Sequence, residues 1–544
     1  MPFHLISRSF LLFAVAALLF TSCRSGNSRE KGFFLYNESS GIASLDPAFA
    51  KNQSIMWAVH QMYNSLVEVD EQLRIKPSLA KSWDVSGDGL VYTFHLRGDV
   101  FFHDDACFPE GRGRRMVADD VVFSLQRIMD PSTASSGAWI FNDRVKKEGG
   151  FIALDDSTFQ LTLERPFPPI LGIMSMQYCS IIPKEAVANY GAGFRSHPVG
   201  TGPFRFVAME EGQSLIMRRH EQYFEFDSAG RRLPYLNGVK VSFYDSKATE
   251  FLLFRQGILH FVNDIDASFK DEVLNKRGEL RKDWEGRIRL SKHPYLNTEY
   301  LGILVDSLNP LVKASPLRFR AVRQAINYGF DRRKMMLYLR NSIGIAAESG
   351  FVPAGLPSFD SMVVRGYQYN PLAARKLLAE AGFPNGKGLG EIRLLTIPIY
   401  AELASYIVRE LEELGLNVKV EVVQKSLLLE QTAQSQALFF RGSWIADYPD
   451  AENYLSVFYS HNPAPPNYTR YKNPAFDELY ERALLETNDS ARFRLYQEMD
   501  NILLKDAPVV PLWYDEVIRL VQPNVKDFRP NGLNLLELRQ VEIE

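Results

Sequence analysis

The chain has 544 residues, more than a single hydrophobic core usually supports, so two or three domains are expected. Hydrophobic residues make up 46% and charged residues 23%, and no segment is of low complexity, which excludes disordered, collagen-like and coiled-coil proteins. The net charge of −3 at pH 7 provides no basic surface for nucleic acid.

Residues 1–22 have the pattern of an export signal. Arg8 precedes an apolar run of about eleven residues, which matches the core of a signal peptide and is too short to cross a bilayer. Small residues then precede Cys23, and this order resembles the lipobox of bacterial lipoproteins, although Phe20 replaces the usual leucine. We expect Cys23 to carry a lipid that anchors the chain to a bacterial membrane, facing the periplasm, with residues 23–32 as a tether. A plain secretory signal is the alternative.

Two further cysteines remain, Cys107 and Cys179. Cysteines left over in an oxidising compartment often pair, and these two lie in the same third of the chain. Two buried free thiols are an equally open interpretation. Two cysteines by themselves cannot form a structural zinc site.

Short strand-like runs occupy the first third of the chain. In the segment VYTFHL, Tyr92, Phe94 and Leu96 alternate with polar residues, which is the period of a half-buried strand. Asp88 and Gly89 come just before this run and favour a hairpin turn.

Helical periodicity occurs in later segments, each with apolar residues on one face. We expect helices within residues 118–130, 317–340, 370–384 and 400–415, the last followed by an alternating strand. In the segment 317–340, the pattern predicts one helix with its arginines on the solvated face. Helices and strands are mixed throughout, so the predicted fold class is α/β.

No complete catalytic or cofactor motif occurs in the sequence. GxSxG, HExxH, a P-loop lysine and a full GxGxxG are all absent. GFPNGKGLG, residues 382–390, follows a helix and is interpreted as a turn. His103, Asp104 and Asp105 could lie near a metal, but the sequence fixes no further ligand. We therefore predict no catalytic residue, no metal and no cofactor.

Several segments resemble, in the same order, the sequence signature of the peptide-binding (family 5) solute-binding proteins of ABC transporters. The matching segments run across nearly the whole chain after the export signal and are KPSLAKSWDVSGDGLVYTFHLRGDVFFHDD, MVADDVVFSLQRIMDP, HPVGTGPFRF, AVRQAINYGFDRRKM, YNPLAARKLLAEAGFPNGKG and DAPVVPLWY.

The resemblance implies a two-lobed "Venus flytrap" fold with an extra inserted domain. Lobe I would comprise residues 33–68, 198–297 and 512–544, the extra domain residues 69–197, and lobe II residues 298–511. Such a protein, a monomer, would capture a peptide between its lobes and deliver it to the permease subunits of an ABC importer.

The resemblance also implies ligand-binding residues in and around the segment SWIADYPDAENYLSVF. Asp447 stands where oligopeptide binders of this family carry the acid that grips the amino terminus of the ligand. Arg441 matches a position where some members hold the carboxylate end. Trp444 and Tyr448 would line the cleft or pack near the hinge. A buried ammonium group requires such a carboxylate because an unpaired charge is costly.

Other interpretations stay open at this point. Asp447 could form a structural salt bridge, and Asp450 is better placed to cap the following helix. Within the same family, the solute could be a metal chelate, a sugar or haem. Outside it, a secreted hydrolase could use Asp447 and Asp450 as acid and base, or a surface lipoprotein could serve as an adhesin or scaffold.

Overall fold

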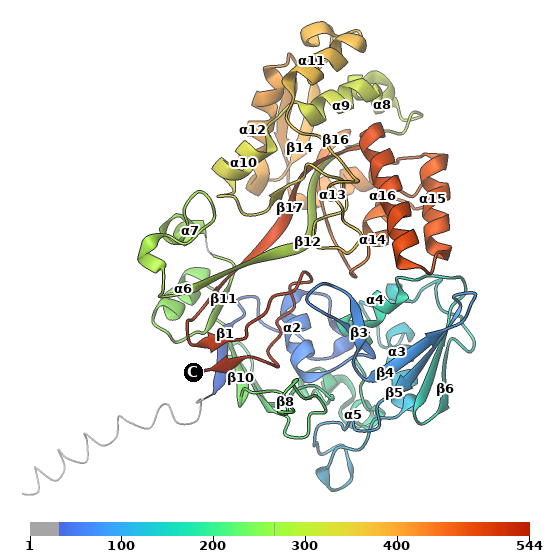
Figure 1. The fold of residues 1–544 in the computed structure, drawn as a ribbon, viewed down its shortest axis with the longest axis vertical. Coiled ribbons are helices and arrows are strands. Elements are labelled where there is room, and N and C mark those ends of the chain that lie inside the picture. Colours follow the sequence, from blue (N-terminus) through green and yellow to red (C-terminus); the bar gives the residue numbers. More distant parts are fainter. Residues whose placement is uncertain (1–31, 266) are drawn as a thin grey trace, which may run out of the picture.

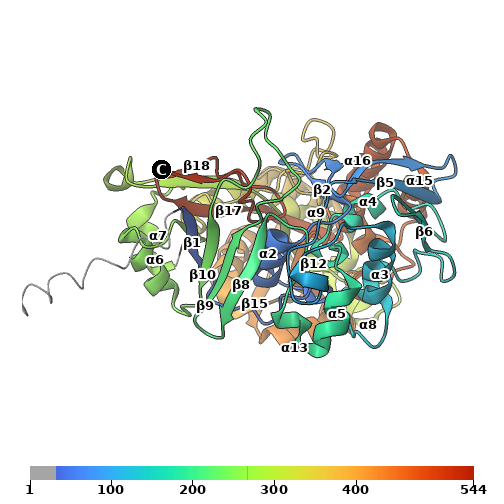
Figure 2. The ribbon, with the colours of Figure 1, turned by 90° about the horizontal axis from the view of Figure 1, so that it is seen from below.

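The protein is described here by a computed structural model that covers residues 32–544 except residue 266. The expectations for residues 1–22, for Cys23 and for most of the tether lie outside the described residues. The fold is mixed α/β with two lobes and an additional domain, as predicted (Figure 1). Lobe II lies above lobe I and the extra domain, which sit side by side below it (Figures 1 and 2).

Two long antiparallel strands run from one lobe into the other. They are β12 (Arg289–Ile303) and β17 (Val509–Val521), and they belong to a seven-stranded sheet in the order β11-β17-β12-β16-β14-β15, with β13 paired to β17. Their register shifts between Pro294 and Thr298, at the junction of the lobes. The predicted lobe boundaries after residues 297 and 511 fall inside these two strands, so the lobes share them.

Lobe I is built on a four-stranded sheet in the order β1-β10-β9-β8, in which only the β1–β10 pair is parallel. Its strands and helices, together with the short elements near the C-terminus, are β1 (Phe33–Asn37), α2 (Gln53–Met62), β8 (Phe204–Glu210), β9 (Ser214–Arg219), β10 (Gly238–Ser242), α6 (Lys247–Arg255), β11 (Phe261–Asn263), α7 (Ala267–Val273), β18 (Val525–Lys526) and β19 (Glu542–Ile543).

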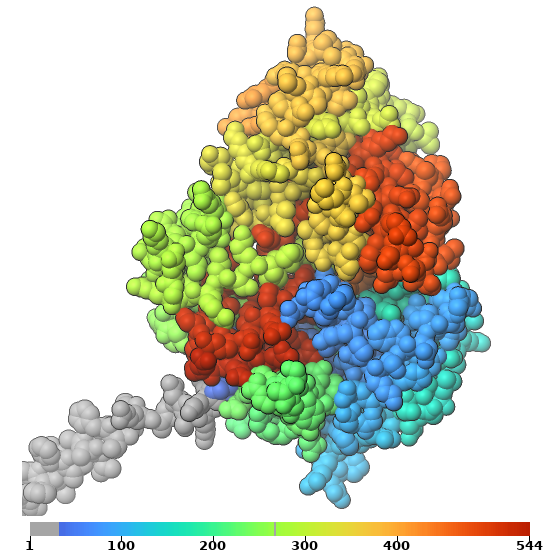
Figure 3. Space-filling view, in the orientation of Figure 1, coloured from blue at the N-terminus to red at the C-terminus, as the bar shows by residue number. Residues whose placement is uncertain are grey.

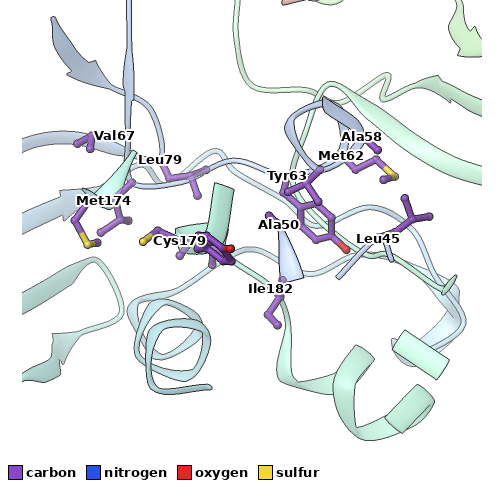
Figure 4. Packing of buried hydrophobic residues seen from close by; sticks show 14 of the residues in the cluster. Leu45, Ala50, Ala58, Met62, Tyr63, Val67, Leu79, Met174, Cys179 and Ile182 are labelled. Carbon is purple, nitrogen blue, oxygen red and sulfur yellow. The ribbon is translucent and has the colours of Figure 1, made fainter. Parts of the chain in front are cut away.

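The extra domain contains an antiparallel sheet in the order β4-β5-β7-β6, covered by helix α3. Its elements are β2 (Val67–Val69), β3 (Ile75–Pro77), β4 (Ala80–Val85), β5 (Val91–Leu96), α3 (Ala118–Met129), β6 (Phe151–Asp155), β7 (Thr158–Thr162), α4 (Ile170–Met174) and α5 (Lys184–Tyr190). One continuous hydrophobic core runs beneath this domain and lobe I, so Met62 and Tyr63 of lobe I pack in the same cluster as Met174 and Ile182 (Figure 4).

Lobe II carries helices on both sides of the upper part of the seven-stranded sheet (Figure 1). Its remaining elements are α8 (Pro310–Ala314), α9 (Arg320–Tyr328), α10 (Arg332–Leu339), β13 (Ile345–Ala346), α11 (Pro371–Glu380), β14 (Ile392–Thr396), α12 (Ala401–Glu412), β15 (Val418–Val422), α13 (Lys425–Ala433), β16 (Phe439–Ile445), α14 (Glu452–Leu455), α15 (Pro474–Leu485) and α16 (Asp489–Asp506). Most of its buried residues form clusters of their own, although Tyr448 packs in the core of lobe I and the extra domain. Figure 3 shows lobe II as the upper part of the molecule, in contact with the parts below it.

Local sequence signals account for several of these elements. Strand β5 buries Tyr92, Phe94 and Leu96 on alternate positions, as predicted. Helix α11 begins after Asn370, whose side chain accepts a hydrogen bond from the Ala373 amide at 3.0 Å. These signals depend only on residues near each other in the chain, and the structure confirms them.

The single helix predicted for residues 317–340 is wrong in two respects. The chain breaks into α9 and α10 because Asp331 caps a new helix, accepting a hydrogen bond from the Lys334 amide at 3.0 Å. Two of its arginines, Arg323 and Arg332, are buried rather than solvated. Arg332 donates to the Pro511 carbonyl at 2.6 Å and so ties α10 to β17.

The disulfide considered for Cys107 and Cys179 is not formed, since both are free thiols. Cys179 is fully buried, and its Sγ lies 3.3 Å from the Ile173 carbonyl oxygen. Figure 4 shows Cys179 among apolar side chains of the shared core. Burial raises the pKa of both thiols, to about 12 for Cys107. Cys179 therefore behaves as a buried apolar group, whereas Cys107 is only half-buried.

We predict that Arg332→Met lowers the free energy of unfolding by about 3 kcal/mol, because it leaves several buried carbonyl groups without a donor. Burial already lowers the pKa of Arg332 to about 10. The neighbouring Arg333→Met is the matched control: Arg333 is exposed and pairs with Glu348 at the surface, so its loss should cost less than about 1 kcal/mol. Urea denaturation checks this, and equal effects of the two changes would contradict it.

Candidate functional site

A cavity of about 530 Å³, which we call the cleft cavity, lies where the two lobes and the extra domain meet. It is lined by Trp57 of lobe I, Trp139 and Tyr178 of the extra domain, Leu296 of β12 and Asp447 of lobe II. Its size and its mixture of aromatic walls with a few polar groups are typical of small-molecule sites.

A second cavity of about 890 Å³, which we call the side cavity, extends between the extra domain and lobe II. Arg144 of the extra domain and Trp444 and Tyr448 of lobe II line it. Trp139 and Asp447 line both cavities. Asp447 therefore stands at the boundary between the two spaces.

The end of strand β16 positions Asp447. The strand pairs with β12 up to Ile445, and the Ala446 amide then donates to the Leu296 carbonyl at 2.9 Å, which ties the chain to the junction of the lobes. Asn453 orients the next residue: its side-chain oxygen lies 3.3 Å from the Asp447 amide nitrogen, and its nitrogen donates to the Asp447 carboxylate at 3.3 Å.

The Asp447 carboxylate is open to the cavities and carries no ion pair within the described part of the chain. The surrounding protein partly excludes water from this carboxylate. This desolvation raises the pKa of Asp447 above the ordinary value of an aspartate. The Asn453 hydrogen bond and the positive charge of Arg144 offset part of that rise. A carboxylate in such a place gains from a cationic ligand.

Trp444 and Tyr448 line the side cavity and also hold this segment together. The Trp444 indole nitrogen donates to the Asn453 side-chain oxygen at 2.9 Å. The buried Tyr448 hydroxyl donates to the carboxylate of Glu452, and its ring packs against Phe167 of the extra domain with ring centres 6.4 Å apart. Both residues thus line the side cavity next to Asp447, and neither lines the cleft cavity.

Arg441 has a partner inside lobe II. It pairs with the buried carboxylate of Glu299 at 2.5 Å, and its guanidinium lies over the Tyr400 ring, 3.9 Å from the ring centre. Only 12% of its side chain is exposed, and it lines neither the cleft cavity nor the side cavity. A ligand carboxylate at this position would compete with Glu299.

Asp450 lines neither cavity. Its carboxylate accepts a hydrogen bond from the Glu452 amide at 2.9 Å and lies 3.6 Å from Arg492. It therefore supports the start of α14, although the cap position itself is occupied by Ala451. The geometry gives no support to an acid–base pair of Asp447 and Asp450.

Two other motifs have structural partners. The His103 ring nitrogen lies 2.9 Å from the carbonyl oxygen of Gly202. Gly202 belongs to the glycine-rich turn, which packs closely against helix α2. An added Cβ on Gly200 or Gly202 would lie within 2.5 Å of the Met62 backbone, so this turn requires glycine. Within the described residues, no group of three or more histidine, cysteine or acidic side chains could hold a metal ion.

Sequence reasoning missed the lobe I and extra-domain walls of the site. The sequence does not identify Trp139 as a ligand-facing residue, because an isolated tryptophan is equally compatible with a core position, which is where Trp57 lies. The buried carboxylate of Glu452 receives hydrogen bonds from Tyr448 and Tyr480, and the sequence gives no sign of this role. Its burial raises its pKa, a feature that only the tertiary packing creates.

Comparison with known proteins assigns the fold to a family. Residues 74–466 match the model of the bacterial extracellular solute-binding proteins, family 5 Middle. The chain belongs to this family. Its members are solute-binding proteins of ABC importers, of the periplasmic or extracellular type, and they bind solutes rather than act as enzymes.

Relatives of this family-5 protein are named for binding different solutes. Heme-binding protein A of Haemophilus influenzae is 27% identical over 96% of this chain and 96% of its own length. The periplasmic oligopeptide-binding protein OppA of Salmonella typhimurium is 26% identical over 91% of this chain and 89% of its own. The solved structure of HbpA2 from Haemophilus parasuis, 23% identical, covers 94% of this chain and all of its own with a TM-score of 0.82. In the described part of the chain, no helix is both long and apolar enough to span a membrane.

Arg441→Met should lower the free energy of unfolding by about 3 kcal/mol, because it leaves the Glu299 carboxylate buried without its cation. Restoring neutrality with Glu299→Gln in the same chain should recover much of that loss. Arg393→Met, which breaks an exposed pair with Glu391, serves as the control and should change stability by less than about 1 kcal/mol. Chemical denaturation of the wild-type protein, Arg441→Met, the double variant and Arg393→Met measures these differences. A double variant as unstable as Arg441→Met would contradict the predicted role of the ion pair.

Proposed function

We propose that this family-5 protein captures a short peptide in the cleft cavity and delivers it to the permease of an ABC importer. Asp447 binds the amino terminus of the peptide. The observation that carries the proposal is the Asp447 carboxylate, which is open to the cavity, surrounded by protein and free of any ion pair in the described structure.

The remaining walls of the cavity fit the constant parts of a peptide. Side-chain amides of Gln53 and Gln177 offer donors and acceptors for a peptide backbone. Trp139, which is 39% exposed, and Tyr178 supply apolar surface for side chains of different size. A haem or sugar ligand brings no ammonium group for Asp447, and the oligopeptide-binding relative is nearly as similar as the haem-binding one.

The proposal places the protein on a membrane surface by a lipid on Cys23, with the two lobes in the periplasm. A lipid at that position would hold the binding lobes close to the permease. Cys23→Ser should move the protein from the membrane fraction to the soluble fraction of its host; retention in the membrane fraction would contradict the anchor.

Asp447→Asn should weaken peptide binding roughly 30-fold or more, about 2 kcal/mol, because it removes the charge partner of the ligand's ammonium group and leaves the fold intact. The matched control is Asp245→Asn, at an exposed aspartate that lines neither cavity. Native mass spectrometry of protein from its own host identifies co-purified peptides, and calorimetry with those peptides measures the loss. Wild-type protein that carries no peptide and binds none from a protein digest would contradict the proposal.

Peptide affinity should fall as the pH drops, at a higher pH than an ordinary aspartate would require. Because burial raises the pKa of Asp447, its carboxylate takes up a proton earlier on acidification, and the neutral acid no longer pairs with an ammonium group. Calorimetric titrations between pH 7.5 and about pH 4.5 check this. The Asp447→Asn variant should lose this part of the pH dependence, and an unchanged profile would contradict the assignment.

A further inference from the structure

The cleft cavity holds two charged side chains, and they come from opposite lobes. Among the described residues that line it, Lys51 of lobe I is the one cation and Asp447 of lobe II is the one anion. Lys51 is exposed, and its ammonium group forms no hydrogen bond or ion pair with the residues that the structure describes. Neither charge forms an ion pair within the described residues.

Lys51 directly precedes helix α2, and the start of that helix adds hydrogen-bond donors to the same wall. The side chain of the N-cap Asn52 accepts from the Ile55 amide at 3.1 Å. Within the described chain, the amides of Gln53 and Ser54 have no acceptor. Free amides at a helix start next to a lysine favour an anion.

A buried arginine lies behind this wall. Arg519 of β17 is fully buried and has no carboxylate partner; it donates to the Asn534 side-chain oxygen at 2.6 Å, and its Nε and Nη1 atoms have no partner among the described atoms. Asn534 in turn donates to the Gln53 side chain at 3.1 Å, and both of these residues line the cavity. The lobe I side of the cleft thus has one positive charge at its surface, Lys51, and one buried behind it, Arg519.

Resting on the peptide-binding function proposed above, we infer that Lys51 binds the carboxylate end of the ligand while Asp447 binds its ammonium end. The substrate class is then a short zwitterionic peptide that bridges the two lobes. Each terminus is held by a different lobe, so a ligand with both charges stabilises the closed arrangement more than the open one. A ligand that lacks one charge loses the ionic contact with one of the lobes and therefore stabilises the closed arrangement less.

The test uses dialanine, trialanine and tetraalanine as free acids, as C-terminal amides and as N-acetyl acids. Calorimetry at low ionic strength should show that amidation weakens binding to the wild-type protein by about tenfold or more. Lys51→Met should weaken binding of the free acids by a similar factor and leave the affinity for the amides unchanged. Lys147→Met, at an exposed lysine outside both cavities, is the control and should change neither.

Small-angle scattering supplies a second measurement. The free acids should reduce the radius of gyration of the wild-type protein, and the amides should not. Equal affinities for acids and amides, or an equal loss of both in Lys51→Met, would overturn the role of Lys51 while leaving peptide binding in place. Failure of all forms to bind, together with an absence of co-purified peptide, would instead overturn the proposed function and this inference with it.

Discussion

The antiparallel pairing of β12 with β17 is the constraint on which the arrangement of both lobes depends. These strands are long enough to belong to both lobes, 15 and 13 residues, and their register shifts at the junction. An irregular pair bends and twists more than a regular ladder. Because β16 pairs with β12 in the same sheet, its end reaches the junction and carries Asp447 into the cleft. The position of the candidate ligand site thus follows from the sheet.

Within the described part of the chain, two arginines inside lobe II have partners within the fold, whereas the two charges at the cleft cavity do not form ion pairs. Inside the lobe, Arg441 is paired with Glu299, and Arg332 is surrounded by carbonyl groups. At the cleft, neither Asp447 nor Lys51 has an ion-pair partner among the described residues, and Asp447 keeps only the hydrogen bond from Asn453. A buried charge must be compensated within the fold, whereas a charge that faces solvent in a cleft can be left for a ligand. This contrast is the physical basis for assigning Asp447 to the ligand and Arg441 to the scaffold.

The packing also indicates which parts move together. Lobe I and the extra domain share the largest hydrophobic core, while most buried residues of lobe II form clusters of their own, with Tyr448 and Leu73 as contacts across the boundary. Packed cores resist deformation, so closure around a solute is expected to displace lobe II as a unit against the body formed by the other two domains. The cleft cavity lies on that boundary, where such a movement changes its size most.

The sequence by itself determined the elements that rest on neighbouring residues and the family that rests on ordered motifs. The alternation in β5 and the Asn370 cap of α11 are local, and so was the cap at Asp331, which sequence reasoning overlooked in favour of one long helix. The resemblance also pointed to Asp447. Only the tertiary structure decided which charges are already paired: Glu299 lies 142 residues from Arg441, and Cys107 and Cys179 remain separate thiols. Only the fold brought Lys51 and Asp447 to the same cavity. Periodicity and helix capping depend on residues that are close in the sequence, so a short segment predicts them. The partner of a charge depends on packing between distant segments, which no short segment predicts.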